Sequence, residues 1–596
     1  MRGASEMRRL LAVGTAGGVL LLSSGCDLRG KSSEAAGEVA YTWTPPKVET
    51  VAGVPAAAIR EAIGRHLAGE RPEDITAELW THVQRLYKEY GGSALWMETT
   101  GPNRARTGAL LGALAEAHTD ALDLEEYPLA ALDSAIRAVR AANPPTAEQL
   151  ASADVLLSSA YLALAEDLLS GQIDPASVSQ DWHIEAQHER LDSAVVHSLR
   201  ADRLATGIAN MRPRGEDYEA LRKSIGAMRE RVAAGGWQPV PEGKPLKPGD
   251  RDDPARLTAL RARLAAEGLL GGTRDSGLGT RSRAARDSST ADASSPESRV
   301  PSPAVYDREL AGAVAVYQAR HAIGVDSILG DETVKSLNVP ADYRLGQVAA
   351  NLERHRWLPR SLGERYIYVN VPAFRLEAWD STGKALEMKV IVGQEYEGKS
   401  TPVFSDRMET VVFRPYWNVT PDIQAKELAP KIAADPGYLA RNNMEYYRDG
   451  GETRIRQRPG GKNSLGLVKF LFPNSFNIYL HDTPNRELFG KDVRAFSHGC
   501  IRVEKPAELA QWVLGWDAGK VQQAMQNGPD NASVKVPRKL PVYITYGTAY
   551  LRDGTLHFGN DLYHRDDTLV KATAAGAAPS SRVVQALEAL GRIAKG

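Results

Sequence analysis

Apolar residues recur at helical spacing through the first part of the chain. Between about residues 56 and 234 the repeats fall three or four positions apart, as on the buried side of an amphipathic helix. The alanine- and leucine-rich segment 151–169 is followed by Gly171, placed like a helix stop. Clear repeats are Leu79, Val83, Leu86 and Tyr87, and then Leu110, Leu111 and Leu114. The pattern predicts an α-helical scaffold domain of five or more helices over residues 56–250.

A second, smaller helical unit is predicted over residues 251–340. Asp253 and Pro254 are a suitable cap and first-turn residue for its first helix. Residues 271–303 are rich in Ser, Arg, Asp and Gly and nearly free of large apolar residues, which predicts a disordered insertion. Helical spacing is seen in Leu257, Leu260 and Leu264 before this insertion and in Leu310, Val314 and Tyr317 after it.

After about residue 365 the period of the pattern changes to two, which predicts β-strands. Residues 422–463 interrupt the strands with a polar segment that carries aromatic residues, and we interpret it as a capping insertion. The predicted strands are 366–371, 374–379, 386–392, 408–413, 467–472 and 476–481. The chain is therefore expected to be an α+β multidomain protein, with a mainly-β domain over residues 341–550 and a C-terminal segment over 551–596.

The amino terminus has the composition of an export signal. Three arginines precede an apolar run at 10–22, which is shorter than the roughly 20 residues of a membrane-spanning helix. Small residues then lead to Cys26, and this arrangement resembles a bacterial lipoprotein signal. We predict a signal peptide over residues 1–25, lipidation of Cys26 and a linker over 26–55. An ordinary secretory signal cut nearby, with Cys26 incidental, is the alternative.

Charge and cysteine content narrow the range of partners. The formal net charge is −1, so there is no electrostatic case for nucleic acid. The chain has only 2 cysteines, which argues against a disulfide framework. His66, His82 and His118 are scattered over helical stretches, so we expect no metal and no cofactor. The protein is expected to be exported and periplasmic, with a lipid on Cys26 as its only membrane contact.

The second cysteine, Cys500, has the surroundings of a nucleophile. A thiol with a pKa of about 8.5 needs a neighbouring base or positive charge to react near neutral pH. His481, at the end of a predicted strand 19 positions earlier, is the candidate base. A carbonyl of residue 482 or 483 is expected to fix its tautomer. A helix is expected to open at Lys505-Pro506 and to run through Leu514.

The residues around Cys500 supply further candidate groups. Gly499 allows a close backbone approach, so the N–H groups of Gly499 and Cys500 are candidate donors to an oxyanion. His498 and Arg502 flank the thiol and are candidates either to lower its pKa or to bind a substrate carboxylate.

Taken together, Ser497-His498-Gly499-Cys500-Ile501-Arg502 and the upstream His481-Asp482-Thr483-Pro484 resemble the L,D-transpeptidase catalytic domain of the YkuD type. The resemblance implies that Cys500 is the nucleophile and His481 the general base. The supporting residues that it implies are Ser497, His498, Gly499, Arg502 and Asp482, and the substrate-binding residues are Trp417 and Tyr479. The segments 414–419 and 469–474 extend the resemblance to the large, multidomain branch of this family.

This resemblance implies an activity on peptidoglycan stem peptides. The cysteine would form a thioester with residue three of a stem tetrapeptide, release D-alanine and pass the acyl group to a second stem as a 3→3 cross-link. With water as acceptor the same thioester gives an L,D-carboxypeptidase, and attachment of a protein to the wall or exchange of D-amino acids also stays open. A non-catalytic wall-binding scaffold is the alternative of another class. No protein partner can be named.

The small helical unit carries a resemblance of its own. Gln318, the turn around residues 326–330 and the closing Leu337-Asn338 resemble a three-helix peptidoglycan-binding module. A helical spacer without a ligand is the alternative interpretation.

Overall fold

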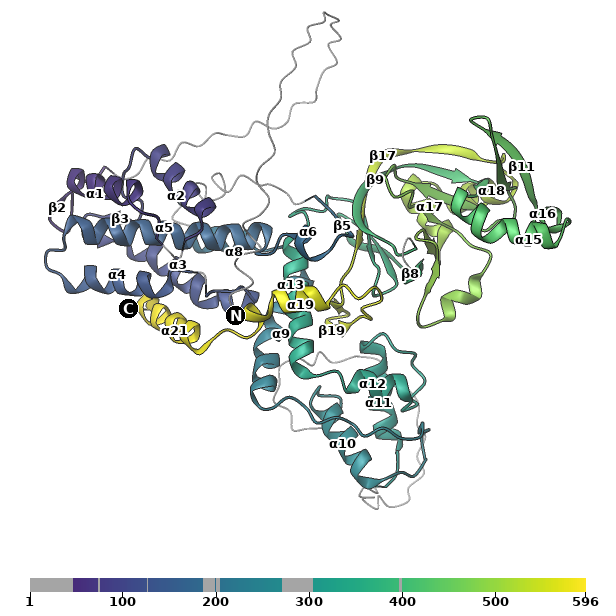
Figure 1. The fold of residues 1–596 in the computed structure, drawn as a ribbon, viewed down its shortest axis with the longest axis horizontal. Helices are drawn as coiled ribbons and strands as arrows, with labels where there is room; N and C mark the ends of the chain where they lie inside the picture. Colours follow the sequence, from purple (N-terminus) through teal and green to yellow (C-terminus); the bar gives the residue numbers. More distant parts are fainter. Residues whose placement is uncertain are drawn as a thin grey trace, which may run out of the picture. The chain divides into compact units, whose positions relative to one another are not determined.

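The structure is a computed structural model that describes residues 47–72, 75–125, 127–185, 199, 204–270, 304–395 and 399–595. It confirms an α+β multidomain chain, with helices through the first half and a mainly-β region after them (Figure 1). The predicted signal peptide, Cys26, the first part of the linker and the insertion at 271–303 lie outside the described residues. Within the described ranges, no helix has the length and apolar character needed to cross a membrane.

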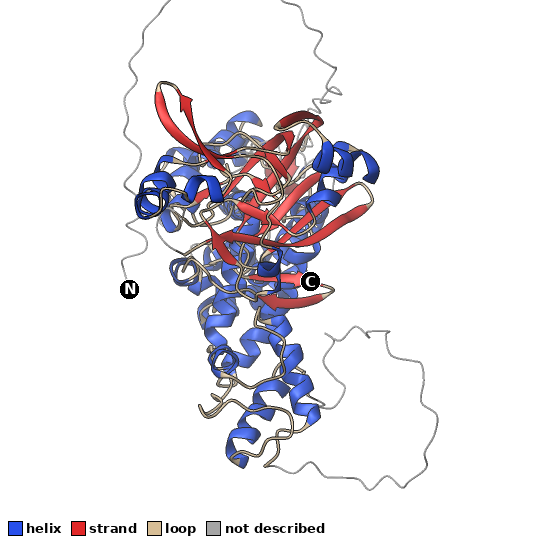
Figure 2. Cartoon of the chain, turned by 90° about the vertical axis from the view of Figure 1, so that its right-hand side faces the viewer, coloured by secondary structure: helices blue, strands red, loops and turns tan. Residues whose placement is uncertain are grey.

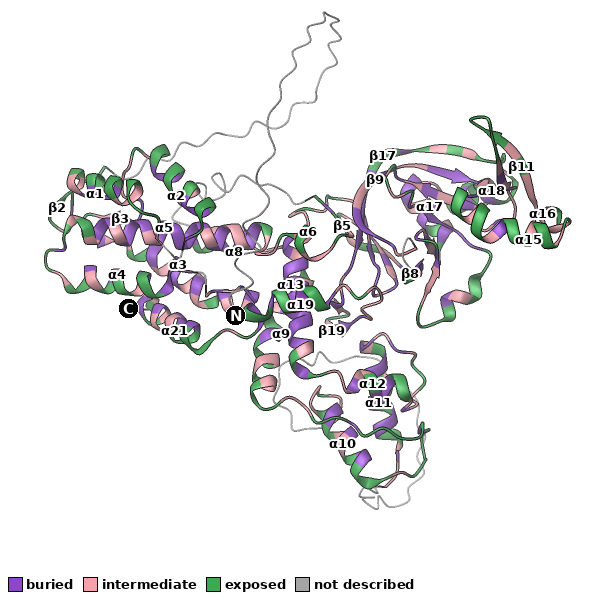
Figure 3. Cartoon of the chain, viewed as in Figure 1, coloured by how far each residue is buried: buried purple, intermediate pink, exposed green. Residues whose placement is uncertain are grey.

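The scaffold helices pack around α5, which is buried along most of its length (Figure 3). A capping box between Thr146 and Gln149 begins α5, and the predicted stop at Gly171, with φ 83°, is confirmed. The helices are α1 (Ala56–Ala68), α2 (Ala77–Glu89), α3 (Arg104–Ala117), α4 (Leu129–Ala141), α5 (Ala147–Ser170), α6 (Pro175–Val178), α8 (Leu204–Met211) and α9 (Glu216–Ala233). The next long helix, α13 (Ala341–Arg356), packs on α9 and leads into the sheet.

The small helical unit has its own apolar core, built from α10 (Pro254–Ala265), α11 (Arg308–Arg320) and α12 (Asp331–Leu337). Gln318 is buried and braces the turn between α11 and α12. Its amide donates to the Asp326 carboxylate (2.8 Å) and accepts from the N–H of Ser327 (3.0 Å). This residue therefore has a structural role in the turn.

The mainly-β region is built on a sheet that closes on itself. Its strands run in the order β13-β14-β16-β8-β7-β6-β17-β9, and β13 also pairs with β9 (Figure 2, red). The bounds are β5 (Trp182–His183), β6 (Tyr366–Asn370), β7 (Arg375–Asp380), β8 (Gly383–Gly393), β9 (Val403–Phe413), β13 (Val468–Leu471), β14 (Leu480–His481), β15 (Ala495–Ser497), β16 (Ile501–Val503) and β17 (Ala532–Thr545). Alternate residues of these strands fill one large apolar core. As predicted, α17 (Pro506–Leu514) begins at Pro506, and α18 (Ala518–Asn527) follows it.

One predicted strand is wrong over most of its length. Residues 476–479 do not continue β14, because the Asn474 side chain turns the chain back. Its carboxamide oxygen accepts from the N–H groups of Phe476 and Ile478 (both 3.1 Å), and Asn477 takes a left-handed φ of 56°. The turn directs the Asn477 carbonyl toward Cys500.

The predicted capping insertion is a small unit with its own sheet. Strand β12 (Glu452–Gln457) pairs with both β10 (Trp417–Asn418) and β11 (Met444–Asp449). Short helical segments complete it: α14 (Pro421–Ile423), the π-helical η3 (Gln424–Leu428), α15 (Ala429–Ala434) and α16 (Tyr438–Arg441). Val419, Leu428 and Ile455 form its apolar core.

The C-terminal segment does not form a separate unit. The hairpin of β18 (Ala549–Arg552) and β19 (Thr555–Phe558) packs against α9, α13 and α11, and α19 (Asp567–Ala572) and α20 (Ala574–Ala577) lie against α13. The last helix, α21 (Ser581–Lys595), returns to α3 and α4 of the scaffold. Its apolar face of Val583, Leu587, Leu590 and Ile593 is buried there. Only tertiary packing brings these distant segments together, so the local pattern could not predict the contact.

Candidate active site

Three adjacent strands place one residue each in a row on the same face of the sheet. Lys469 of β13 pairs with His481 of β14, and His481 pairs with Arg502 of β16. Directly opposed residues project from the same face of a sheet. The register therefore flanks His481 with two cationic side chains, and neither has an ion-pair partner within the described ranges.

Cys500 lies immediately before β16, two positions from Arg502, and so faces the same side of the sheet. Its Sγ is 3.6 Å from the Asn477 carbonyl oxygen. Burial raises the pKa of the thiol, whereas hydrogen bonding from the backbone and side chain of Tyr479 and the charges of Arg502 and Lys469 lower it. Burial is the largest of these effects, so the pKa of the half-buried thiol is raised overall, and the fixed donors and cations offset part of that rise.

His481 is held in one tautomer. Its Nδ1 is 2.5 Å from the Asp482 carbonyl oxygen. Because a carbonyl can only accept, Nδ1 carries the proton and Nε2 is the basic atom. Burial and Arg502 lower the pKa of His481 to about 3, against a raising effect of the Asp482 carbonyl. The imidazole is thus neutral at neutral pH, with Nε2 unprotonated.

The structure does not join His481 directly to Cys500. Between these two described side chains there is no hydrogen bond. Tyr479 contacts both: it hydrogen-bonds the thiol, and its ring centroid is 5.7 Å from that of His481. The imidazole and the thiol are diagonal neighbours on one face, a separation that side-chain rotation or a bound substrate can bridge.

The turn before Cys500 depends on glycine. Gly499 has φ 109°, a conformation that side chains disfavour, and a Cβ there would lie 3.0 Å from Ile478 Cδ1. Ser497 holds the turn: its hydroxyl donates to the Cys500 carbonyl (2.5 Å) and accepts from the Gly499 N–H (3.2 Å). The Gly499 N–H is therefore engaged within the turn, and Cys500 N–H is the stronger candidate for an oxyanion.

The structure places His498 against the capping insertion instead of the thiol. Its Nε2 is 2.5 Å from Glu427 Oε1, and Lys399 Nζ approaches the same carboxylate oxygen at 3.3 Å. This contact lowers the pKa of Glu427, first through the His498 hydrogen bond. Glu427 belongs to η3, so the insertion touches the chain two residues before Cys500.

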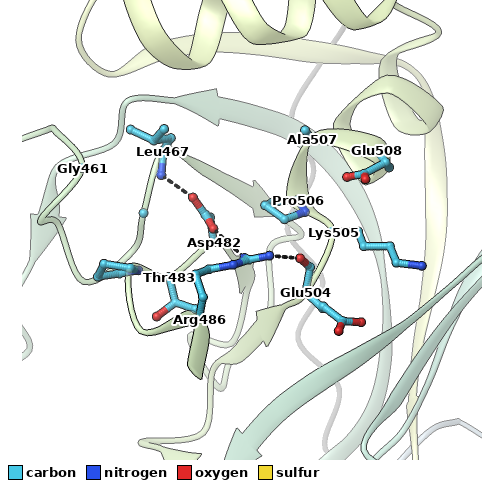
Figure 4. A pocket seen from close by; sticks show the side chains of 12 residues that line it. Gly461, Leu467, Asp482, Thr483, Arg486, Glu504, Lys505, Pro506, Ala507 and Glu508 are labelled. Carbon is cyan, nitrogen blue, oxygen red and sulfur yellow. Dashed lines mark hydrogen bonds and ion pairs between the residues drawn. The ribbon is translucent and has the colours of Figure 1, made fainter. Parts of the chain in front are cut away.

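Asp482 faces the other side of the sheet from Cys500, since it follows His481 in the strand direction. Its carboxylate accepts from the Leu467 N–H (2.9 Å) and from Arg486 (3.3 Å). It lines a hollow of ≈530 Å³ whose wall also includes Glu504 and Lys505 (Figure 4). Asp482 therefore contacts the His481 imidazole through its backbone carbonyl and not through its carboxylate.

Two family models match separate parts of the chain. The L,D-transpeptidase catalytic domain, YkuD, matches residues 364–544, a range that holds Lys469, His481 and Cys500. Residues 364–544 are an L,D-transpeptidase catalytic domain. A Scaffold domain model matches residues 81–225, within the helical region.

The similar proteins carry the same family name. A curated protein of Haemophilus influenzae named "Putative L,D-transpeptidase" is 32% identical over 240 residues, which are 37% of this chain and 48% of that protein. The chain therefore spans about half the length of this relative. The crystal structure of an L,D-transpeptidase from Xylanimonas cellulosilytica shares 14% identity and covers 51% of this chain and 99% of its own, at a TM-score of 0.16. A likeness at that score supports no structural argument.

Several neighbours of the thiol in this L,D-transpeptidase domain were not identified as site residues from the sequence. Lys469 is a charged residue inside the apolar run 467–472, and that was the available signal. The Asn477 carbonyl and Glu427 had no signal, because a turn and a distant insertion bring them in. Tyr479, expected to bind substrate, lies beside the thiol, while Trp417 packs against the core of the capping insertion. No group of three potential metal ligands occurs among the described residues.

Proposed function

We propose that this protein is a peptidoglycan L,D-transpeptidase that forms 3→3 cross-links through a thioester on Cys500. The observation that supports it most is the face shared by Cys500, a neutral His481 with a fixed tautomer, and two cations, inside the matched catalytic domain. A buried structural cysteine would not need this combination.

The reaction would proceed in two acyl transfers. His481 Nε2 takes the thiol proton while Sγ attacks the carbonyl carbon of residue three of the donor stem. The Cys500 N–H stabilises the oxyanion, the carbon–nitrogen bond breaks, and the proton on Nε2 passes to the departing D-alanine amine. The side-chain amine of a second stem then attacks the thioester and gives a proton to Nε2. The new amide forms, and the sulfur leaves and recovers its proton.

The acceptor decides between the related activities. Water in place of the amine would make the protein an L,D-carboxypeptidase, and a protein amine would attach that protein to the wall. A non-catalytic wall-binding scaffold is less well supported, because it has no use for a thiol beside a base.

We also propose that the protein is exported and held at a membrane by a lipid on Cys26. This proposal rests on the charged start, the short apolar run and the small residues before Cys26. Cys26→Ala would release a lipid-anchored protein from the membrane fraction, while an unchanged distribution would contradict the anchor.

The test of the chemistry is the intact mass of the purified protein after incubation with meropenem. One covalent adduct is expected on the wild type and on Cys26→Ala, and none on Cys500→Ala. Because the chain has only 2 cysteines, these variants assign the adduct. The absence of any adduct on folded wild-type protein would contradict the proposed function.

A further inference from the structure

Thr401 lies beside the nucleophile turn with all of its polar groups engaged. It is fully buried. Its hydroxyl donates to the Gly499 carbonyl (2.9 Å) and accepts from the Gly393 N–H (3.0 Å). Its own N–H donates to the Tyr563 hydroxyl (3.2 Å), and its carbonyl accepts from Arg565 (3.2 Å). A residue held at every polar atom has little freedom to move.

The bond from Thr401 acts on the peptide that links Gly499 to Cys500. The only cis peptide recorded for the described residues lies elsewhere, between Asn143 and Pro144, so this peptide is trans. In a trans peptide the C=O and the following N–H point in opposite directions. Holding the Gly499 carbonyl therefore fixes the direction of the Cys500 N–H.

The other backbone atoms of this turn are already in use. Ser497 accepts from the Gly499 N–H and donates to the Cys500 carbonyl. The Cys500 N–H is thus the group that Thr401 leaves available for a developing oxyanion. A donor aimed before the reaction stabilises the transition state without a reorganisation cost.

We infer that Thr401 is a positioning residue that aims the Cys500 N–H at the oxyanion, and that Tyr563 and Arg565 brace it. The inference rests on the proposed function. Both bracing residues lie beyond residues 364–544, so the chain after the matched domain contributes to its active site. The Tyr563 hydroxyl also donates to the Gly393 carbonyl (2.7 Å) and so links Thr401 to Gly393 a second time.

Two reagents separate this role from a general loss of structure. Acylation by meropenem passes through an oxyanion, whereas alkylation by iodoacetamide needs only the thiolate. In the full chain, Thr401→Val should slow acylation roughly tenfold to hundredfold and leave alkylation within about twofold of the wild type. Thr401→Ser, which keeps the hydroxyl, should restore most of the acylation rate.

A matched control is available at the end of β17. Thr545 is equally buried, and its hydroxyl donates to the Val369 carbonyl (3.0 Å). Thr545→Val should leave both rates unchanged. Should Thr401→Val fail to fold, Tyr563→Phe tests the same chain of contacts, with an expected loss of about threefold in acylation alone.

The outcomes distinguish the two proposals. If the wild type is acylated and either Thr401→Val or Tyr563→Phe is acylated equally fast, the positioning role is overturned and the proposed function stays intact. Equal losses of acylation and alkylation would also overturn it, since they indicate a disturbed thiol. A wild type that is alkylated but takes no meropenem would overturn the proposed function and this inference with it.

Discussion

Two buried histidines, His321 in the helical unit and His481 in the catalytic sheet, have the same lowered pKa of about 3. Each is held through Nδ1 by a backbone carbonyl, of Tyr317 at 2.9 Å and of Asp482 at 2.5 Å. In both, burial is the first cause of the shift. Burial, pKa and tautomer therefore do not distinguish a base from a packing residue.

The surroundings of the two rings do distinguish them. His321 is stacked between Tyr317 (3.8 Å) and Phe558 (5.5 Å), and its Nε2 is 3.7 Å from a Glu267 carboxylate. His481 instead lies between the cations Lys469 and Arg502. The thiol of Cys500, two positions before Arg502, lies on the same face of the sheet. Aromatic stacking indicates a structural ring, whereas cations beside a thiol indicate chemistry.

The largest expected effect separates the roles of the two histidines. His481→Gln should slow acylation by meropenem roughly 10²- to 10⁴-fold, since it removes the proton acceptor. The matched His321→Gln should leave the acylation rate within about twofold, although it loses ring stacking and some stability. Rates come from the time course of the intact-mass adduct. Equal losses in the two variants would show that the histidines do not differ in role.

A smaller effect tests the cations. Lys469 lowers the pKa of the Cys500 thiol, so Lys469→Met should raise that pKa and move the pH profile of iodoacetamide alkylation to higher pH. At a fixed pH below the thiol pKa, alkylation should slow by up to about tenfold. Lys535→Met, at an exposed position of β17, is the control for lost charge. If the pH profiles of the wild type, Lys469→Met and Lys535→Met coincide, Lys469 has no effect on the Cys500 thiol.

The smallest effect concerns the capping insertion, which contacts the turn beside Cys500. Glu427→Gln weakens the bonds to His498 and Lys399, half-exposed contacts of the kind that contribute at most about 1 kcal/mol. Alkylation by a bulky maleimide should accelerate up to about threefold relative to iodoacetamide. Asp422→Asn breaks an exposed ion pair with Lys426 within the same insertion and should change nothing. If the ratio of maleimide to iodoacetamide alkylation rates falls or stays unchanged in Glu427→Gln, the capping insertion does not cover Cys500.

Much of the architecture followed from local patterns. The change from helical to alternating spacing near residue 365 located the sheet, and Gly171 and Pro506 marked real helix ends. The closed sheet did not follow, because the β13–β9 pairing joins strands more than fifty residues apart. Residues 476–479 alternate like a strand, but the Asn474 side chain satisfies the backbone groups that a strand partner would otherwise take.

Some site residues also followed from the sequence, and others required the tertiary structure. Cys500, Gly499 and His481 were found because short motifs carry them, and the carbonyl that orients His481 was expected from its sequence neighbour. Lys469 required the strand register, Glu427 required the docking of the insertion, and Thr401 required a hydrogen bond across about a hundred residues.

By itself the sequence determined the α+β organisation and the positions of the candidate nucleophile and its candidate base. These depend on hydrophobic period, turn chemistry and residue type, which act over a few neighbouring positions. Only the tertiary structure decided which charges flank the imidazole and where the Cys500 N–H points. Those properties depend on register and on contacts between distant segments, and electrostatic and hydrogen-bond energies change over distances of a few ångströms.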